Sequence, residues 1–388
     1  MNSTENLTGT GRSITPATQF VNLKGDYGTS DFIMWRGGRL PKITVAFESW
    51  GTLSINHDNV ILIFTGLSPS AHAASSELDP TPGWWEYMIG PGKPIDTNEF
   101  HVICVNSLGS CFGSTGPESI NPKTGKIYGL DFPDLTIEDI AKAGHHLLVE
   151  LGIDHLHTVI GPSMGGMVAL AYALQYPGEV DYLVSISAAT RALPFTLAMR
   201  SLQREIIRSD PAWKGGNYAA NEAPYSGMAL ARKLGLVSYR AAEEWHQRFD
   251  RSRISKDRRT GTPFELEFEV ESYLDYNANK FIHNFDANSY LYLSRAMDWF
   301  DVADHGGSVN SGITKINVKT ELIIGVTTDI LFPPEQQREI VRGLEKAGSC
   351  EECVEYVEIE SISGHDAFLV DSEHFSPVMK RFLDETCS

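Results

Sequence analysis

The residue with the clearest chemical potential in this sequence is a serine held between glycines. Ser163 lies at the centre of the sequence G-P-S-M-G, residues 161–165. A short apolar segment, His157–Ile160, precedes it, and an apolar segment with helical spacing, Met167–Gln175, follows it. Small residues on both sides leave room for a sharp, strained turn that exposes the serine hydroxyl at the end of a strand. We therefore predict that Ser163 is a nucleophile that carries a covalent acyl intermediate.

Acyl transfer also needs N–H groups that bind the oxyanion of the tetrahedral intermediate. Met164 follows the nucleophile at the start of the predicted helix, so its N–H is one candidate. The second donor is expected in the loop after an early strand. Val60–Thr65 has the pattern of such a strand and is followed by Gly66-Leu67-Ser68-Pro69. We predict that the N–H of Leu67 is the second donor; the alternative is that this segment is only a plain turn.

A nucleophilic serine needs a histidine base and an acid, and at such strand–helix turns the acid and then the histidine follow the serine in the chain. Asp329 comes just after the β-rich segment Glu321–Val326, and His365 follows Val354–Ile359. We predict that His365 is the general base and that Asp329 orients it. The competing residues fall in predicted helical segments, where solvated side chains are the simpler interpretation: Asp301, Asp304 and His374.

The elements that must position these residues can be predicted from short apolar segments that end in turn residues. They are Ile43–Trp50, Val60–Thr65, His101–Asn106, Thr158–Ile160, Tyr182–Ser187, Glu321–Val326 and Val354–Ile359. Helical patterns lie between the later ones, for example Ile137–Leu151. This alternation predicts an α/β protein with a mostly parallel central sheet and helices on both faces. With a serine at a strand–helix turn, the arrangement resembles the α/β-hydrolase fold.

One long stretch, residues 191–311, interrupts the alternation and has no convincing strand pattern. Its predicted helices are Ala192–Ile207, Gly227–Leu234, Ala241–Phe249 and Phe268–Phe281. We predict a core domain of residues 21–190 and 312–388, and a helical insertion of residues 191–311 that acts as a lid over the active site. Residues 1–20 are expected to form a flexible N-terminal tail.

The composition restricts the possible partners. The chain has 388 residues, of which 42% are hydrophobic, and a net charge of −18. This charge argues against nucleic acid or an anionic membrane surface as a partner. No apolar run approaches the ~20 residues of a membrane span, and the N-terminus lacks a signal-peptide pattern, so we expect a cytoplasmic protein. Residues 191–260 hold 14 Lys and Arg against 7 Asp and Glu, which fits either a site for an anionic small molecule or a solvated helical face.

The five cysteines do not indicate a metal site or a disulfide framework. Their odd number in so long a chain argues against such a framework. Cys350 and Cys353 form a C-x-x-C pair, but no second ligand pair accompanies it. We interpret this pair as a coincidence in a surface turn, and we predict neither a metal nor a cofactor.

Several further segments, between Phe32 and Phe382, resemble the homoserine/serine O-acyltransferases of methionine and cysteine biosynthesis. The resemblance rests on Trp84-Trp85-Glu86, Ile89-Gly90-Pro91-Gly92-Lys93, Asn106-Ser107-Leu108-Gly109, Gly113-Ser114-Thr115-Gly116-Pro117, Tyr128-Gly129, Phe132-Pro133, Ser163-Met164-Gly165-Gly166-Met167, Tyr290-Leu291-Tyr292-Leu293, Met297-Asp298-Trp299-Phe300-Asp301 and Gly364-His365-Asp366. A generic esterase is not expected to carry all of these segments.

The resemblance implies a ping-pong reaction in which an acyl-CoA acylates Ser163 and the hydroxyl of an amino acid then accepts the acyl group. It implies that an arginine in a G-x-x-L-A-R segment, here Arg232 in residues 227–232, binds the amino-acid carboxylate. It also implies that Asp366, beside the histidine, binds the ammonium group. Without the resemblance, Arg232 would be interpreted as a charge on a surface helix. A homodimer formed through the helical insertion is a further implication.

Two departures from the acetyl-transferring homoserine branch resemble the branch of the serine O-succinyltransferases. The acetyl-transferring homoserine branch has A-L-T-G where this chain has G-L-S-P at residues 66–69. We expect this segment to influence substrate specificity. The same branch also has N-E-V-G-R where this chain has R-S-L-Q-R at residues 200–204, so Arg200 replaces an asparagine. An added cation would favour an acyl group with its own carboxylate, such as succinyl. The alternative is that Arg200 forms a salt bridge within the insertion.

The sequence therefore favours an L-serine O-succinyltransferase that uses succinyl-CoA. An L-homoserine O-succinyl- or O-acetyltransferase stays open, because serine and homoserine differ by one methylene, worth only ~1–3 kcal/mol in a pocket. An esterase or thioesterase with water as the acceptor also stays open, because both chemistries share the acyl-enzyme. A binding protein without catalysis is a fourth alternative, although such proteins usually lose a member of the triad.

Overall fold

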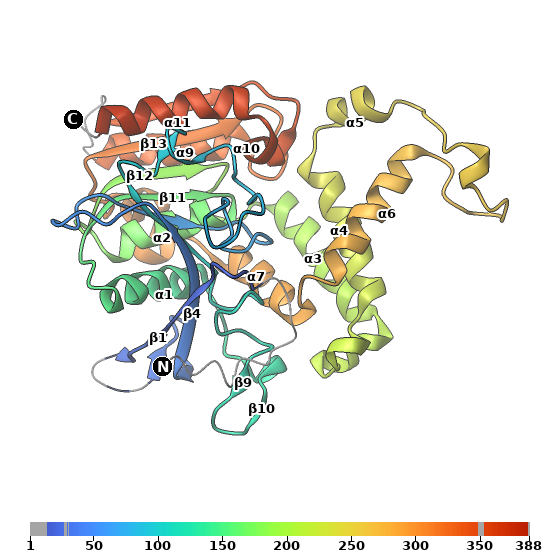
Figure 1. Cartoon of the computed structure of the whole chain (residues 1–388), viewed down its shortest axis with the longest axis horizontal. Coiled ribbons are helices and arrows are strands. Elements are labelled where there is room, and N and C mark those ends of the chain that lie inside the picture. Colours follow the sequence, from blue (N-terminus) through green and yellow to red (C-terminus); the bar gives the residue numbers. More distant parts are fainter. Residues whose placement is uncertain (1–13, 27–28, 30, 348–352, 387–388) are drawn as a thin grey trace.

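A twisted eight-stranded sheet forms the centre of the protein (Figure 1). This computed structural model describes residues 14–26, 29, 31–347 and 353–386. The strands, in spatial order, are β1 (Gln19–Leu23), β4 (Ile43–Trp50), β8 (His101–Val105), β5 (Val60–Phe64), β11 (Leu156–Pro162), β12 (Val180–Ile186), β13 (Thr320–Val326) and β14 (Val354–Ile359). The β1–β4 and β4–β8 pairs are antiparallel, and every pair from β8 to β14 is parallel. The predicted α/β fold with a mostly parallel sheet is confirmed.

The sequences of the central strands explain why the sheet is covered on both faces. All five residues of β5, VILIF, are buried, as are all seven of β11. Strands buried on both sides are expected to be apolar throughout instead of alternating.

The remaining strands form small pairs at the periphery: β2 (Asp31–Ile33) with β3 (Arg39–Pro41), β6 (Ile89–Gly90) with β7 (Ile95–Asp96), and β9 (Ile120–Asn121) with β10 (Lys126–Ile127).

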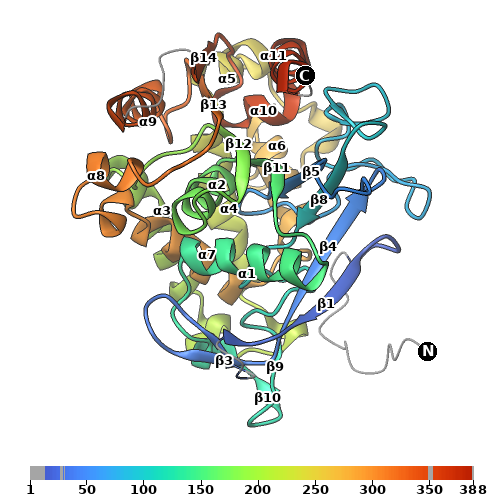
Figure 2. The same ribbon diagram turned by 90° about the vertical axis from the view of Figure 1, so that its left-hand side faces the viewer.

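Helices from different parts of the chain cover the two faces of the sheet (Figure 2). One face packs against α1 (Ile137–Glu150), α2 (Met164–Gln175) and α9 (Pro334–Ala347). The other face packs against α11 (Ser372–Thr386) and apolar side chains from residues 71–100. The short helix α10 (Ala367–Val370) precedes α11. The helices α1, α2, α9 and α11 thus complete the two apolar layers that hold the sheet in place.

The predicted helical insertion, residues 191–311, consists of two differently placed parts. Helices α3 (Pro194–Ser209), α4 (Tyr225–Tyr239), α5 (Ala242–Phe249) and α6 (Glu269–Ile282) lie to one side of the core (Figure 1). Helix α7 (Ala287–Trp299) packs against the core, where the Tyr292 hydroxyl donates to the Phe132 carbonyl at 2.7 Å. Helix α8 (Val309–Ile313) contacts α9. Short 3₁₀ turns are η2 (Gly129–Asp131), η3 (Pro211–Gly216), η4 (Ala220–Glu222), η5 (Lys256–Arg258), η6 (Val302–His305) and η7 (Gly364–Asp366).

The N-terminal prediction needs a correction. Residues 1–13 lie outside the described residues, but β1 begins at Gln19 and Phe20 pairs with Ala46 of β4. The hydroxyls of Thr15 and Thr18 also donate to the buried carboxylate of Glu48. The flexible tail predicted to reach residue 20 is therefore wrong at its end, because this segment adds a strand to the sheet edge.

The cysteines also differ from the prediction. Cys104 and Cys111 are buried, and Sγ of Cys111 accepts the N–H of Asp286 at 3.3 Å. Cys353 takes part in a disulfide bond, although the odd number of cysteines argued against a disulfide framework. Cys350 and Cys387 lie outside the described residues.

The described residues contain neither a membrane-spanning helix nor a metal-binding cluster. None of the helices there is long and apolar enough to cross a membrane. Within the same part of the chain, no group of three or more His, Cys, Asp or Glu side chains is arranged to hold a metal ion.

Candidate active site

Ser163 occupies a strained turn between β11 and α2. Its backbone has φ 57° and ψ −123°, a conformation that is unusual for a residue with a side chain. A Cβ atom on Gly161 would lie 2.0 Å from the carbonyl oxygen of Gly165, and one on Gly165 would lie 2.1 Å from that of Phe64. The two glycines are therefore required by contact between backbones, as the sequence pattern predicts.

The structure brings Ser163, His365 and Asp329 into one hydrogen-bonded triad. The Oγ of Ser163 is 2.7 Å from Nε2 of His365, and Nδ1 of His365 is 2.7 Å from Oδ2 of Asp329. The other oxygen of Asp329 accepts the N–H groups of Leu331 and Phe332 at 2.8 and 2.9 Å. All three side chains of the triad are buried. Such a triad allows the imidazole to remove a proton from the hydroxyl while the carboxylate fixes its tautomer.

The two partners of the serine come from loops after neighbouring parallel strands. Asp329 lies after β13 and His365 lies in η7, after β14. Thr328 ties these loops together, since its hydroxyl donates to the Ser361 carbonyl at 2.6 Å and accepts the N–H of Gly364 at 3.2 Å. Sequence reasoning missed Thr328; the only signal was its position next to the predicted acid.

The environment of His365 favours its protonated form. Burial lowers the pKa of the imidazole, but the charge and the hydrogen bond of Asp329 outweigh burial, so that the pKa lies above the ordinary value of 6.5. The same balance stabilises the imidazolium that forms when Ser163 gives up its proton.

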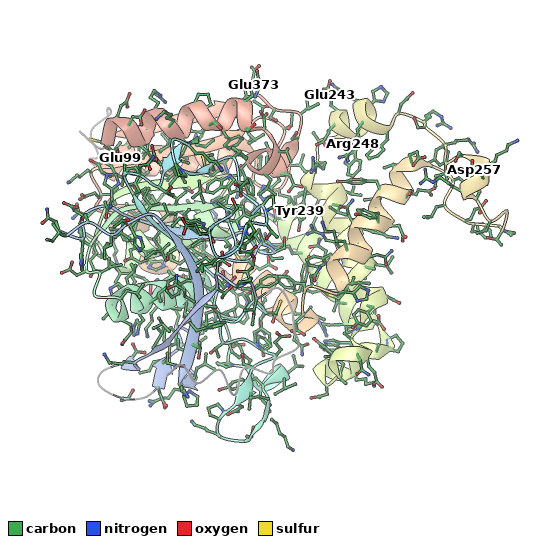
Figure 3. The ribbon with its side chains drawn as sticks, in the orientation of Figure 1. Glu99, Tyr239, Glu243, Arg248, Asp257 and Glu373 are labelled. Carbon is green, nitrogen blue, oxygen red and sulfur yellow. The ribbon has the colours of Figure 1, made fainter. Side chains whose placement is uncertain are left out.

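Ser163 opens onto a cavity between the sheet and the helical insertion, which we call the active-site cavity. Its wall includes the predicted loop 66–69, parts of α3, α4 and α7, and the segment around His365. Tyr239, at the end of α4, contributes to this wall at the boundary between core and insertion (Figure 3). The lining residues are Gly66, Leu67, Ser68, Pro69, Ser163, Thr196, Met199, Arg200, Gln203, Ser238, Tyr239, Tyr290, Ser294, Met297, Leu331, Phe332, His365, Asp366, Phe368 and Leu369.

The two predicted oxyanion donors come from the start of α2 and from the loop after β5. Met164 is the first residue of α2, so its N–H has no acceptor within the helix. Leu67 lies in the cavity wall. This placement fits the arrangement in which a helix start and an early loop supply one N–H each.

Arg200 is a buried cation in the cavity wall with one uncommitted N–H₂ group. Its Nε is 2.5 Å from Oδ1 of Asp298, whose Oδ2 is 2.6 Å from Nη2 of Arg204. Arg200 is only 6% exposed. Its Nη2 is buried and has no hydrogen-bond partner within the described part of the chain. The salt bridge considered for Arg200 from the sequence is therefore present, and it leaves Nη2 of the guanidinium unpaired among the described residues.

Asp366 lies in the wall of the active-site cavity, but part of its carboxylate is already engaged. Its Oδ2 is 3.1 Å from Nε of Arg240, which also binds Glu244 at 2.6 Å. Burial raises the pKa of Asp366 above its ordinary value, opposed by the charges of Arg240, His365 and Arg232. Sequence reasoning missed Arg240, because no motif surrounds it.

Arg232 lies near Asp366 but does not line the active-site cavity. Its guanidinium carbon is 4.5 Å from the ring centroid of Phe281 and 5.7 Å from that of Tyr239. Its Nε is buried without a hydrogen-bond partner among the residues described. The structure thus places Arg232 against Tyr239, a residue of the cavity wall, but not in the wall itself.

Comparison with known proteins places this site in a family. The model of the α/β hydrolase fold matches residues 59–372. The chain belongs to the α/β-hydrolase fold family, in the branch of the homoserine and serine O-acyltransferases. A serine O-succinyltransferase of Litchfieldella anticariensis is 58% identical over 95% of this chain and 98% of its own.

Two solved structures share the architecture. A homoserine O-acetyltransferase from Bacillus anthracis superimposes with a TM-score of 0.84 at 31% identity, over 95% of this chain and 97% of its own. Esterase E22 superimposes with a TM-score of 0.83 at 31% identity, over 94% of this chain and 99% of its own. The family therefore includes both transferases and hydrolases with closely similar backbones.

Within this family framework, the competing acid and base candidates have other contacts. The Oδ1 of Asp301 accepts the N–H of Ala303 at 2.8 Å and caps η6. Asp304 is exposed. His374 is 54% exposed at its side chain and pairs with Asp371. These contacts fit the solvated helix ends that the sequence favoured for them.

Proposed function

We propose that the protein is an acyl-CoA-dependent O-acyltransferase that transfers a succinyl group from succinyl-CoA to the hydroxyl of L-serine. The observation that carries the proposal is that the triad of Ser163, His365 and Asp329 opens onto a cavity lined by Arg200. The Nη2 of this buried guanidinium has no partner among the described residues. The name of the Litchfieldella anticariensis relative supports the same reaction.

In the first half of the reaction, Ser163 attacks the thioester carbonyl of succinyl-CoA. His365 takes the hydroxyl proton through Nε2, and Asp329 stabilises the resulting imidazolium. The N–H groups of Leu67 and Met164 bind the oxyanion. When the carbon–sulfur bond breaks, His365 returns the proton to the departing thiolate, which leaves as CoA and produces succinyl-Ser163.

In the second half, the acceptor enters the same cavity. His365 removes the proton from the hydroxyl of L-serine, and the resulting nucleophile attacks the succinyl-Ser163 ester. Collapse of the intermediate releases O-succinyl-L-serine, and His365 returns the proton to Ser163. The product would feed cysteine biosynthesis.

Arg200 distinguishes succinyl from acetyl donors in this proposal. A succinyl group ends in a carboxylate, which a guanidinium binds through charge-assisted hydrogen bonds. The buried Nη2 of Arg200 has no partner among the described residues, so binding the carboxylate would satisfy an otherwise unpaired donor. An acetyl group would leave that donor unpaired.

The acceptor is held by its own two charges. Oδ2 of Asp366 is occupied by Arg240, and the other oxygen is assigned to the ammonium group of the amino acid. Arg232 binds the carboxylate after a shift of Tyr239. The loop 66–69 lines the cavity beside Ser163 and limits the length of the acceptor chain.

A two-by-two assay tests the proposal, with serine or homoserine as acceptor and succinyl- or acetyl-CoA as donor. We expect the highest kcat/KM for serine with succinyl-CoA. A preference for homoserine would move the protein to the alternative homoserine O-acyltransferase. CoA release that is equal with and without acceptor, and without O-acyl product, would favour the esterase alternative, which the likeness to esterase E22 keeps in view. No CoA release at all would leave the non-catalytic alternative.

A cytoplasmic homodimer completes the proposal. The cytoplasm is where acyl-CoA substrates are available. The dimer is supported by exposed apolar side chains on the outer helices of the insertion: Phe195 and Leu202 on α3, and Leu230 and Val237 on α4. Sedimentation equilibrium tests it, since Leu202→Lys with Leu230→Lys should convert the dimer to a monomer.

A further inference from the structure

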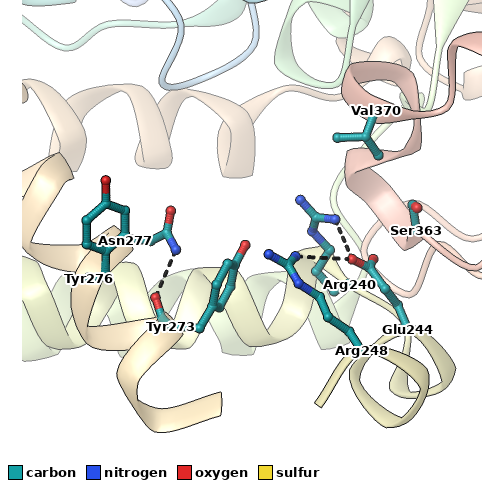
Figure 4. Close-up of a pocket in the computed structure, with 8 residues that line it drawn as sticks. All are labelled: Arg240, Glu244, Arg248, Tyr273, Tyr276, Asn277, Ser363 and Val370. Carbon is teal, nitrogen blue, oxygen red and sulfur yellow. Dashed lines mark hydrogen bonds and ion pairs between the residues drawn. The ribbon is translucent and has the colours of Figure 1, made fainter. Parts of the chain in front are cut away.

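A second hollow lies beside the active-site cavity, between the helical insertion and residues 363–370, which include His365 (Figure 4). We call it the arginine–tyrosine pocket. Its volume is about 740 Å³, within the range of small-molecule sites. The side chains that matter here are Arg240, Arg248, Tyr273, Tyr276 and Ser363.

The pocket and the active-site cavity share one short segment of chain. Ser363 and Val370 line the pocket, while His365, Asp366 and Leu369, between them in sequence, line the cavity. Arg240 lines the pocket and binds Asp366, which lines the cavity. Residues 363–370 and the Arg240–Asp366 ion pair therefore border both the pocket and the active-site cavity.

The chemistry of the lining fits a phosphorylated nucleotide. Arg240 is committed to Asp366 and Glu244. Arg248 is available, because its nearest carboxylate, Glu244, lies 3.7 Å away and 46% of its side chain is exposed. The guanidinium carbon of Arg248 is 4.3 Å from the ring centroid of Tyr273. Arginine pairs with phosphate, and tyrosine rings stack on bases.

The charge balance of the pocket decides which ligand it can hold. Glu244 partly neutralises the charges of Arg240 and Arg248, so the pocket attracts a weakly charged molecule only weakly. A ligand with several phosphate charges can replace Glu244 at Arg248, where the contact is 3.7 Å long. Glu244 then stays paired with Arg240 at 2.6 Å. Tyr276, which is 68% exposed, adds a second ring at the rim. The surrounding residues 191–260 carry 14 Lys and Arg against 7 Asp and Glu, which favours an anionic ligand.

We infer that the arginine–tyrosine pocket binds the phosphorylated nucleotide end of the acyl-CoA, an inference that rests on the proposed function. Arg248 contacts the phosphates, and the rings of Tyr273 and Tyr276 pack against the adenine. The acyl-bearing arm passes Asp366 into the active-site cavity. Arg240 acts as a positioning residue between the two sites.

Two donors test this inference: succinyl-CoA and succinyl-pantetheine, which lacks the phosphorylated nucleotide. The wild-type protein should have a lower KM for succinyl-CoA. The preference for succinyl-CoA is measured as the ratio of the two kcat/KM values. Arg248→Glu should reduce this ratio by about tenfold or more, because one charge-assisted hydrogen bond to a phosphate is lost. Tyr276→Ala should reduce it less. Arg251→Glu is the matched control, because Arg251 is exposed on the same part of the insertion and does not line the pocket.

Direct binding separates this inference from the proposed function. Adenosine 3′,5′-bisphosphate should bind the wild-type protein in calorimetry and should bind Arg248→Glu at least tenfold more weakly. If neither donor is cleaved but this binding pattern holds, the proposed function fails and the pocket assignment stands. An unchanged donor preference in Arg248→Glu together with unchanged binding overturns the assignment. A change in oligomer mass with an unchanged donor preference also overturns it, and identifies the pocket as a contact with a second copy.

Discussion

Arg200 and Asp298 form a buried ion pair, with Nε 2.5 Å from Oδ1, that uses only one end of the guanidinium. Asp298 is shared with Arg204, so the carboxylate holds two cations at once. The Nη2 of Arg200 remains without a hydrogen-bond partner in the part of the chain that the structure describes. A buried donor of this kind costs about 1–3 kcal/mol until a ligand satisfies it. Asp298 therefore holds Arg200 through Nε and leaves Nη2 unpaired among the described residues.

The first prediction follows from this pair. Arg200→Asn should lower kcat/KM for succinyl-CoA relative to acetyl-CoA by about 10- to 100-fold, because a charge-assisted hydrogen bond to the succinyl carboxylate is lost. Steady-state kinetics with both donors measures the ratio. Arg204→Asn is the matched control, since Arg204 pairs with the same Asp298 but does not line the active-site cavity. An unchanged ratio in Arg200→Asn would remove Arg200 from donor selection.

The second prediction concerns the acid of the triad. Asp329→Asn should lower kcat by about 10⁴-fold, the loss seen when a triad loses its carboxylate and the histidine takes the wrong tautomer. The free energy of unfolding should be measured alongside, because Oδ1 of Asp329 also accepts two backbone N–H groups. An amide oxygen in the place of Oδ1 can still accept both of them. Near-normal turnover in a folded variant would contradict the assignment of Asp329.

The third prediction is the pH dependence. His365 must be neutral to accept the proton of Ser163, and its pKa lies above the ordinary value of 6.5. Activity should therefore be lost as pH falls through that raised pKa, so the acidic limb of kcat/KM against pH should have its midpoint above 6.5. The charge of Asp329 raises this pKa, so Asp329→Asn should move the midpoint of its residual activity to lower pH. A midpoint below 6.5 in the wild-type profile would be inconsistent with this environment.

Much of this site was predictable because strand ends of a parallel sheet meet at one edge. The segments before Asp329 and His365 are short and β-rich, and the fold places both residues beside Ser163. The strained turn at Ser163 could be predicted as well, since only glycine tolerates the backbone contacts on either side.

What the sequence did not reveal depends on how helices pack. Arg240 reaches Asp366 across 126 positions of the chain, and no local pattern specifies that the residue after α4 meets η7. Arg232 was assigned by resemblance alone, and its place between Phe281 and Tyr239 is set by the packing of α4 against α6. Long-range side-chain pairs of this kind leave no periodic signal in the sequence.

The last prediction concerns the acceptor. The ammonium group of L-serine should bind Asp366 only when its carboxylate is charged, and burial raises the pKa of that carboxyl while Arg240 opposes the shift. The KM for L-serine should therefore rise as pH falls through the raised pKa of Asp366. Asp366→Asn should raise this KM by about tenfold or more through loss of a charge-assisted contact, and its KM should no longer depend on pH in that range. Arg240→Met should shift the pH dependence upward, since it removes the charge that keeps Asp366 ionised, whereas Arg248→Met should not, because Arg248 does not contact Asp366. A KM for serine that is insensitive to both Asp366→Asn and Arg240→Met would place the ammonium group elsewhere in the active-site cavity.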